Sequence, residues 1–256
     1  PGPCAIVFPQ KRIGNIDQVK FNEPSGVVYH RERGTLFVVG DNGDICEIQT
    51  DGKLVAQKHI RQADYEGITY DPSTGLLYVA IEGEEKISEF DPEGLVEQRV
   101  FTLPRKVDGK LLLKKGAGGI EALTLAPDST QPHGGFFYVA NQCFDLTKED
   151  DISAIFEVTL PLRSGSTTDS IATIVRYISP GVIDLSGLQY DASSDHLLVI
   201  SDGTNTLHRI TRAGEVLESY AFPGANQEGI AFDDDGHVYV AQDSGGIIKM
   251  KWLKVA

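Results

Sequence analysis

A short phrase recurs five times in the sequence, and its second residue is always Ser or Glu. The copies read PSGVVY, YEGITY, IEALTL, LSGLQY and QEGIAF, and the residues in question are Ser25, Glu66, Glu121, Ser186 and Glu228. If the copies occupy equivalent places around one axis, these five side chains converge. Two carboxylates held about 4 Å apart at an effective dielectric of about 20 repel by roughly 4 kcal/mol. The three Glu side chains must therefore either bind protons or share a cation.

The ligand chemistry of this set favours a hard cation. The five residues offer carboxylate and hydroxyl oxygens, with no imidazole or thiolate among them. Calcium accepts about six to eight oxygen ligands in a loose geometry, whereas zinc prefers nitrogen and sulfur. We therefore predict one Ca²⁺ ion held by these five residues and by water. The alternative is that the Ser and Glu side chains only cap unpaired backbone groups at the ends of strands.

The elements around each phrase predict how the five residues are positioned. Each copy reads as a strand, a polar turn and a second strand, as in SGVVYHRERGTLFVVGD from Ser25. Third and fourth short strands usually follow, joined by turns such as DGK and AGE. The copies start 41, 55, 65 and 42 residues apart. Four strands at a spacing of about 40 residues are typical of a β-propeller blade, so we predict an all-β, five-bladed β-propeller.

In such a fold the first strand of each blade lines a central channel, which would bring the five residues onto one ring. We expect one domain over residues 1–256, with a six-bladed propeller as the alternative if one blade has diverged. The fifth copy supplies only three strands before the chain ends, and a strand at about 12–20 is expected to complete that blade and leave no open sheet edge. The wider spacings are explained by a hairpin-like insert at 104–119 and by loops at 141–152 and 162–171.

The loops between second and third strands share the ring end of the channel, and they are acidic. They read DNGD at 41–44, EGEE at 82–85, NQCFD at 141–145, DGTN at 202–205 and QDSGG at 242–246. A rim of this kind attracts cations and repels polyphosphate. The insert is the exception, because it carries five basic residues, namely Arg105, Lys106, Lys110, Lys114 and Lys115. It is either a lid that brings a small anionic ligand to the metal or a solvated hairpin whose lysines protect an edge strand.

Composition excludes several classes of protein. The chain has 256 residues, with 37 acidic and 23 basic side chains and a formal charge of −14. Nucleic-acid binding needs an excess of Lys and Arg, so a general nucleic-acid binder is excluded. No apolar run reaches the roughly 18 residues that a membrane-spanning helix requires. We expect a monomer.

The cysteines and the methionine give three further expectations. Cys46 lies in an apolar strand pattern and is expected in the core, whereas a Cys4–Cys143 disulfide is left open. Met250 is the only methionine, so we expect Pro1 not to be the native start and an upstream targeting segment to precede it. The expected location is outside the cytoplasm, in the periplasm, at the cell surface or secreted.

The order Ser–Glu–Glu–Ser–Glu in these phrases resembles the SdiA-regulated family of bacterial propeller proteins, over residues from about 22 to 250. It also resembles the five-bladed calcium-activated nucleotidase (apyrase) fold, but only in blade count and ring order. The resemblance implies that the five ring residues are calcium ligands, and the family offers no defined activity. The EGI and IEAL phrases are similar to phytase-like esterases, and EGIAFD with GHVYVA to six-bladed lactonases, although two lactonase ligand positions read Ser186 and Glu228 here.

Two functions follow as hypotheses. The first is a calcium-binding propeller of undefined activity, which serves as a structural or binding platform. The second is a calcium-dependent hydrolase of phosphoesters or esters, in which calcium orients the substrate and a free ring Glu activates water. No nucleophile elbow, Walker loop or HExxH motif occurs in the sequence, so no catalytic residue is predicted.

Overall fold

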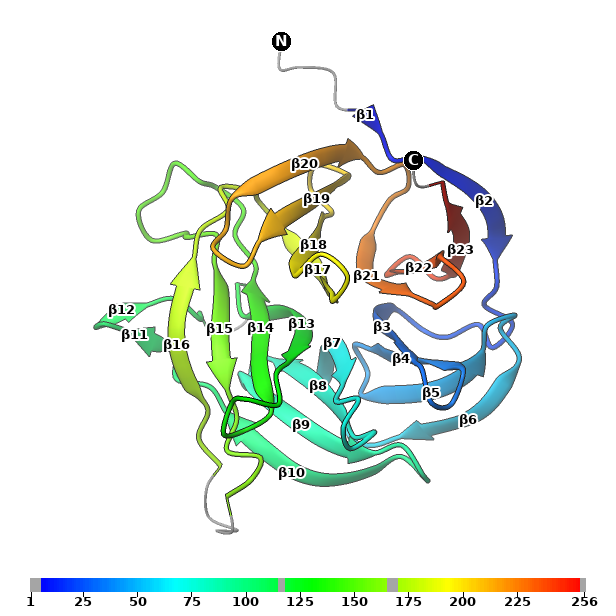
Figure 1. Ribbon diagram of the computed structural model, residues 1–256, viewed down its shortest axis with the longest axis horizontal. Coiled ribbons are helices and arrows are strands. Elements are labelled where there is room, and N and C mark those ends of the chain that lie inside the picture. The colour runs from blue at the N-terminus through cyan, green and yellow to red at the C-terminus, as the bar shows by residue number, and fades with distance from the viewer. Residues whose placement is uncertain (1–5, 115–117, 165–169, 254–256) are drawn as a thin grey trace.

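Five antiparallel sheets stand in a ring around one axis in the computed structural model, which describes residues 6–114, 118–164 and 170–253 (Figure 1). The described residues form strands, turns and loops without a helix. The protein is therefore a five-bladed β-propeller, which confirms the predicted fold and excludes the six-bladed alternative. Within the described ranges there is no helix long and apolar enough to cross a membrane.

Each blade begins with its innermost strand and proceeds outward. Blade 1 comprises β3 (Pro24–His30), β4 (Thr35–Gly40), β5 (Asp44–Gln49) and β6 (Leu54–His59); blade 2 comprises β7 (Asp64–Tyr70), β8 (Leu77–Glu82), β9 (Lys86–Asp91) and β10 (Val96–Thr102). Blade 3 comprises β13 (Ile120–Pro127), β14 (Gly135–Asn141), β15 (Ile155–Thr159) and β16 (Thr173–Ile178); blade 4 comprises β17 (Leu185–Asp191), β18 (His196–Ser201), β19 (Thr206–Thr211) and β20 (Val216–Ala221). Blade 5 comprises β21 (Gln227–Phe232), β22 (His237–Gln242), β23 (Ile247–Trp252) and, as its outer strand, β2 (Gln10–Asn15).

The N-terminal segment joins the last two blades. β2 pairs antiparallel with β23, so the outer strand of blade 5 lies at 10–15, somewhat earlier than the expected 12–20. A strand that the sequence did not predict, β1 (Ile6–Val7), pairs parallel with β20 and gives blade 4 a fifth strand. Between the two strands, the Phe8 ring is 1% exposed and lies 5.3 Å from the rings of both Phe222 and Trp252. One aromatic side chain therefore anchors the segment at the seam between blades.

The middle strands of the blades are buried on both faces. In β4, for example, Leu36, Phe37, Val38 and Val39 are all fully buried. A strand whose two faces both pack against other sheets reads as a continuous apolar run rather than an alternating one. This packing of blade on blade explains why the second strand of each repeat is so hydrophobic.

The innermost strands approach one another most closely at the glycine of the recurring phrase. A Cβ atom on Gly26 would lie 2.4 Å from the Glu66 carbonyl oxygen, and one on Gly67 would lie 2.4 Å from the Leu123 amide nitrogen. A Cβ on Gly229 would meet Val27 N at 2.9 Å. The glycine is therefore required by backbone contact between neighbouring blades.

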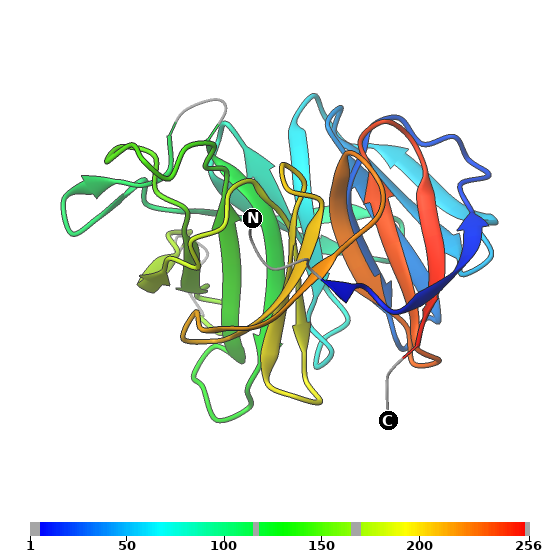
Figure 2. The same ribbon diagram turned by 90° about the horizontal axis from the view of Figure 1, so that it is seen from above.

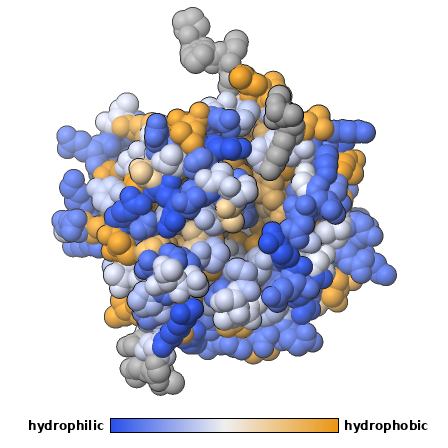
Figure 3. Space-filling view, viewed as in Figure 1, coloured by the Kyte–Doolittle hydropathy of each residue, from blue (hydrophilic) through white to orange (hydrophobic). Residues whose placement is uncertain are grey.

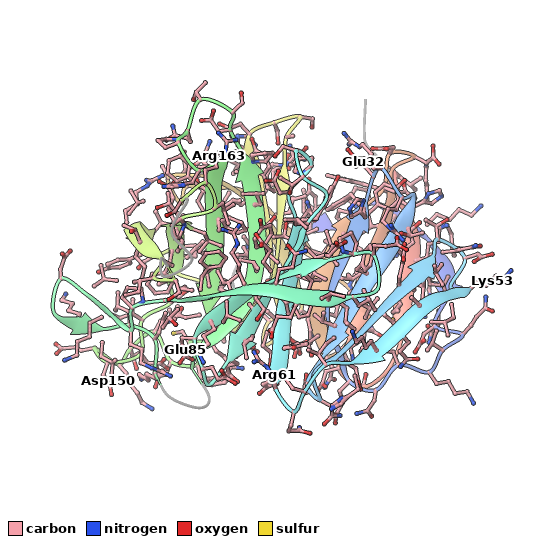
Figure 4. The ribbon with its side chains drawn as sticks, turned by 90° about the horizontal axis from the view of Figure 1, so that it is seen from below. Glu32, Lys53, Arg61, Glu85, Asp150 and Arg163 are labelled. Carbon is pink, nitrogen blue, oxygen red and sulfur yellow. The ribbon has the colours of Figure 1, made fainter. Side chains whose placement is uncertain are left out.

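The two ends of the propeller differ in what they expose. Figure 4 shows Glu85, Arg61 and Asp150 at one end and Glu32 and Arg163 at the other. The end that carries Glu32 faces the viewer in Figure 3, where the surface is mostly hydrophilic with hydrophobic residues scattered among the polar ones. The hairpin of β11 (Lys106–Val107) and β12 (Lys110–Leu111) projects outward from the ring in both ribbon views (Figures 1 and 2).

Candidate metal centre

Every ring residue lies at an irregularity of an innermost strand. Pairing between the first and second strands shifts register at this place in each blade, which is the pattern of a β-bulge. A bulge leaves one residue out of the ladder and can redirect its side chain. The bulged positions are Ser25 in β3, Glu66 in β7, Glu121 in β13, Ser186 in β17 and Glu228 in β21. The same local distortion thus presents the predicted residue in all five blades.

The ring side chains are withdrawn from solvent. Ser25 and Ser186 are 2% exposed, Glu121 is 7% exposed and Glu66 is 9% exposed, whereas Glu228 is half-buried. Ser25, Ser186 and Glu228 line a narrow cavity together with the glycines that follow them. Two of the three carboxyl groups are therefore held where an isolated charge is costly.

A second group of carboxyl groups surrounds the ring. Asp41, Glu82, Asp202 and Asp243 lie at or just after the ends of the second strands, within loops whose acidity the sequence showed. Asp64 and Asp184 precede Glu66 and Ser186 by two residues, and these two positions were not predicted. For Asp64 the signal was present, because it lies in β7 two residues before Glu66, and residues two apart in a strand face the same side. Asp184 precedes β17 and has a left-handed backbone with φ of 51°, so strand alternation could not have found it.

Four carboxyl groups stand in a chain at the junction of blades 2 and 3. Glu121 lies beside Glu82, Glu82 beside Asp64, and Asp64 beside Glu66, and each pair is close enough to share a proton. One oxygen each of Asp41, Asp64 and Glu66 lie within 4.8 Å of one another, and the Ser25 hydroxyl donates to Asp41. A carboxyl group can donate to another only when it carries a proton, so this chain holds together either through protons or through a cation that replaces them.

Burial and mutual repulsion shift the acidity of the whole cluster. The pKa values of Glu66 and Glu121 are raised well above the ordinary range, first by burial and then by Glu121 and Asp64 acting on Glu66 and by Glu82 and Glu228 acting on Glu121. Burial also raises the pKa of Asp64 and Glu82.

The other side of the ring follows the same rule. Burial, followed by the charges of Asp202 and Asp184, raises the pKa of Glu228 to about 8. Burial raises the pKa of Asp41 to about 6, although the Ser25 hydroxyl opposes the shift. The charged groups that perturb these ring and rim acids most are themselves carboxyl groups, so none of the shifts comes from a cationic side chain.

The donors fit a hard divalent cation. All are oxygens, and Asp64 Oδ1 is buried with no hydrogen-bond partner in the described part of the chain. The Ser186 hydroxyl donates to the Gln227 carbonyl oxygen at 2.6 Å, which leaves its lone pairs free to accept or coordinate. Calcium takes carboxylate, hydroxyl and water oxygens in variable number, which suits a cluster of this size better than zinc chemistry does.

The described hairpin of the basic insert lies away from this cluster. The hairpin points away from the axis (Figures 1 and 2), and Lys106 and Lys110 are exposed on it. Lys114 lies 3.9 Å from Asp151, and Lys115 falls outside the described residues. The lid interpretation gains no support from this position, whereas a solvated hairpin agrees with it.

The two described cysteines, Cys46 and Cys143, are buried outside the cluster. Cys46 lies fully buried in β5, as its apolar surroundings predicted, and Cys143 is buried with its thiol donating to the Asp151 carbonyl oxygen at 3.1 Å. Cys4 falls outside the described residues, so the Cys4–Cys143 disulfide, which the sequence left open, is not tested.

Fold and site together define a five-bladed β-propeller with an acidic cluster at one end of its channel. A family model described as SdiA-regulated matches residues 8–244. The chain belongs to the SdiA-regulated family. No curated protein matches the chain.

Solved structures are similar to this chain at low sequence identity. The glutaminyl cyclase of Myxococcus xanthus is 12% identical, with a TM-score of 0.64, and the match covers 98% of this chain and 100% of that one. The hydrazine synthase of Kuenenia stuttgartiensis is 15% identical, with a TM-score of 0.49, and the match covers 85% of this chain and 55% of that one. At 12% identity, the likeness to the glutaminyl cyclase concerns the fold alone.

Proposed function

We propose that the protein binds one calcium ion on the propeller axis, through Ser25, Glu66, Glu121, Ser186, Glu228 and water. The observation that carries the proposal is the chain of carboxyl groups from Glu121 to Glu66, in which both end residues are at most 9% exposed. A divalent cation would neutralise charges that otherwise need protons. Asp41 and Asp64 are close enough to Glu66 to contribute further oxygens.

The bound ion would act first as a structural link. Its ligands come from the innermost strands of all five blades, so one ion would tie the ring together where carboxylates otherwise repel. The acidic rim would then serve as a platform for a ligand that carries positive charge or that binds through the ion.

The hydrolase alternative has less support. A phosphoester substrate would have to approach a mouth lined by Asp41, Glu82, Asp202 and Asp243, and the basic hairpin projects away from it. Metal-free and calcium-loaded protein should be assayed with nitrophenyl phosphate, nucleoside diphosphates, phytate and, because of the structural likeness, a peptide with an N-terminal glutamine. Background rates throughout support the platform; calcium-dependent turnover of any substrate would favour an enzyme.

Binding itself is tested by calorimetric titration of chelator-treated protein with Ca²⁺, Mg²⁺ and Zn²⁺. We expect one Ca²⁺ per chain, with weaker binding of the other two ions. The double variant Glu66→Gln with Glu121→Gln should lose binding. Glu32→Gln, an exposed residue at the other end of the blades (Figure 4), should bind like the unmodified protein. Absence of binding at millimolar calcium would refute the proposal.

A further inference from the structure

One acidic residue at the ring end is buried without belonging to the ring. Glu85 lies in the turn between β8 and β9, is 0% exposed and has a left-handed backbone with φ of 47°. Its ion pair in the described structure is with Arg105, at the base of the insert. The contact is a charge pair rather than a well-formed hydrogen bond, because neither Glu85 oxygen has a hydrogen-bond partner among the described residues.

Arg105 donates to three carbonyl oxygens and so joins two backbone segments. Its guanidinium donates to the Gly83 carbonyl oxygen at 2.8 Å, in the same turn as Glu85. It also donates to the carbonyl oxygens of Lys114 at 2.9 Å and Leu113 at 3.3 Å, on the returning side of the insert. A planar guanidinium with five donors is suited to such a junction, whereas an ammonium group is not.

The segments that Arg105 joins lead directly into the carboxyl cluster. The Glu85 turn begins at Glu82, which stands in the middle of the carboxyl chain. At the end of the insert, the Gly119 amide donates to Glu82 Oε1 at 3.2 Å. A Cβ on Gly119 would lie 2.5 Å from Glu85 Oε1 and 2.9 Å from Glu82 Cγ, so the return of the insert packs tightly against both acids.

We propose that Arg105 is a positioning residue for the cation site. It fixes the turn that carries Glu82 and the backbone that brings Gly119 against it, and it thereby sets where Glu82 meets Glu121 and Asp64. The inference rests on the proposed calcium site. It gives Arg105 and Gly119, near the two ends of the insert, a role in the wall of that site.

The sign of the effect separates positioning from simple electrostatics. Arg105 is a positive charge near a cation site, so its field alone opposes calcium, and removing it should tighten binding. Loss of positioning does the reverse. Partners that orient metal ligands typically change affinity by about 10- to 100-fold when removed, and we expect the lower end of that range here.

The experiment compares calcium dissociation constants of three variants by calorimetry. Arg105→Gln should bind roughly tenfold more weakly. Lys106→Gln removes the same charge from an exposed position on the adjoining strand, and it should bind equally or slightly more tightly. The double variant Arg105→Gln with Glu85→Gln leaves the net charge unchanged and no unpaired buried acid. It should bind as weakly as the single variant, and it decides the question if the single variant does not fold.

Hydrogen exchange of metal-free protein in chelator gives a second readout that needs no calcium. Residues 82–86 should exchange faster in Arg105→Gln and in the double variant, and at the normal rate in Lys106→Gln. Unchanged or tighter calcium binding by the Arg105 variants, or a lowered melting temperature without a change in affinity, would overturn the proposal. Failure of the unmodified protein to bind calcium would instead refute the proposed function, and normal exchange at 82–86 would then refute the role of Arg105 as well.

Discussion

At the residue scale, the recurring phrase combines two requirements that the sequence shows side by side. The Ser or Glu is turned out of the ladder by a bulge, and the following Gly allows the neighbouring blade to approach. Blade 3 has Ala122 in place of Gly, so the contact varies around the ring. The phrase could therefore be recognised from the sequence, although the bulge that joins its two roles could not.

Substitution of the central glycine should damage the fold. In Gly67→Ala the new methyl group would lie 2.4 Å from a backbone nitrogen of the next blade, and backbone cannot move aside as a side chain can. We expect a loss of about 1–3 kcal/mol in the free energy of unfolding, measured in urea. Gly203→Ala is the control, since its nearest neighbour is the Asp184 side chain at 3.1 Å. Equal stability of the two variants would contradict the close approach.

The acidity of Glu228 predicts a pH dependence of stability in the absence of calcium. The folded-state pKa is raised to about 8, whereas the unfolded side chain titrates near its usual value of about 4.3. Between these values the folded state binds more protons than the unfolded state, so stability falls as pH rises from about 4.3 to 8. We expect the melting temperature in chelator to fall over this range and saturating calcium to reduce the fall. In Glu228→Gln the fall should be smaller; a metal-free melting temperature that rises toward pH 8 would contradict the assignment.

At the scale of elements, the four-strand repeat was predictable because each strand carries its own apolar pattern and turn. The N-terminal contribution was harder. β2 was expected two residues further along the chain than it begins, and its pairing with β23 is interrupted between Arg12 and Gly14. β1 has two residues, too few for any periodicity, and the Phe8 ring that follows it packs in an apolar cluster formed by blades 4 and 5.

Phe8 should therefore contribute far more to stability than its terminal position implies. Phe8→Ala removes a buried ring from contact with Phe222 and Trp252, and substitutions of this kind cost about 3–5 kcal/mol. Ile6→Ala is the matched control, since Ile6 is 73% exposed in the neighbouring strand. Thermal unfolding should show a large drop for the first variant and almost none for the second. Similar melting temperatures would mean that the seam does not depend on this segment.

At the scale of the whole molecule, the formal charge of −14 is distributed unevenly. Ring and rim carboxyl groups gather at one end of the channel, while Arg105 and Lys114 of the insert are engaged with Glu85 and Asp151. The sequence predicted the ring and the acidic loops because both follow the repeat. It could not predict the carboxyl chain through Glu82 and Asp64 or the outward course of the insert, because these depend on how blades 2 and 3 meet.

The central claim is that this carboxyl cluster holds a calcium ion on the axis. The most direct measurement is a crystal structure of the calcium-loaded protein with anomalous scattering used to locate the ion. Our account predicts one ion at the ring end, with oxygens of Glu66, Glu121 and Glu228 at about 2.3–2.6 Å. Carboxyl groups still hydrogen-bonded to one another with no ion between them, in crystals grown at millimolar calcium, would contradict it.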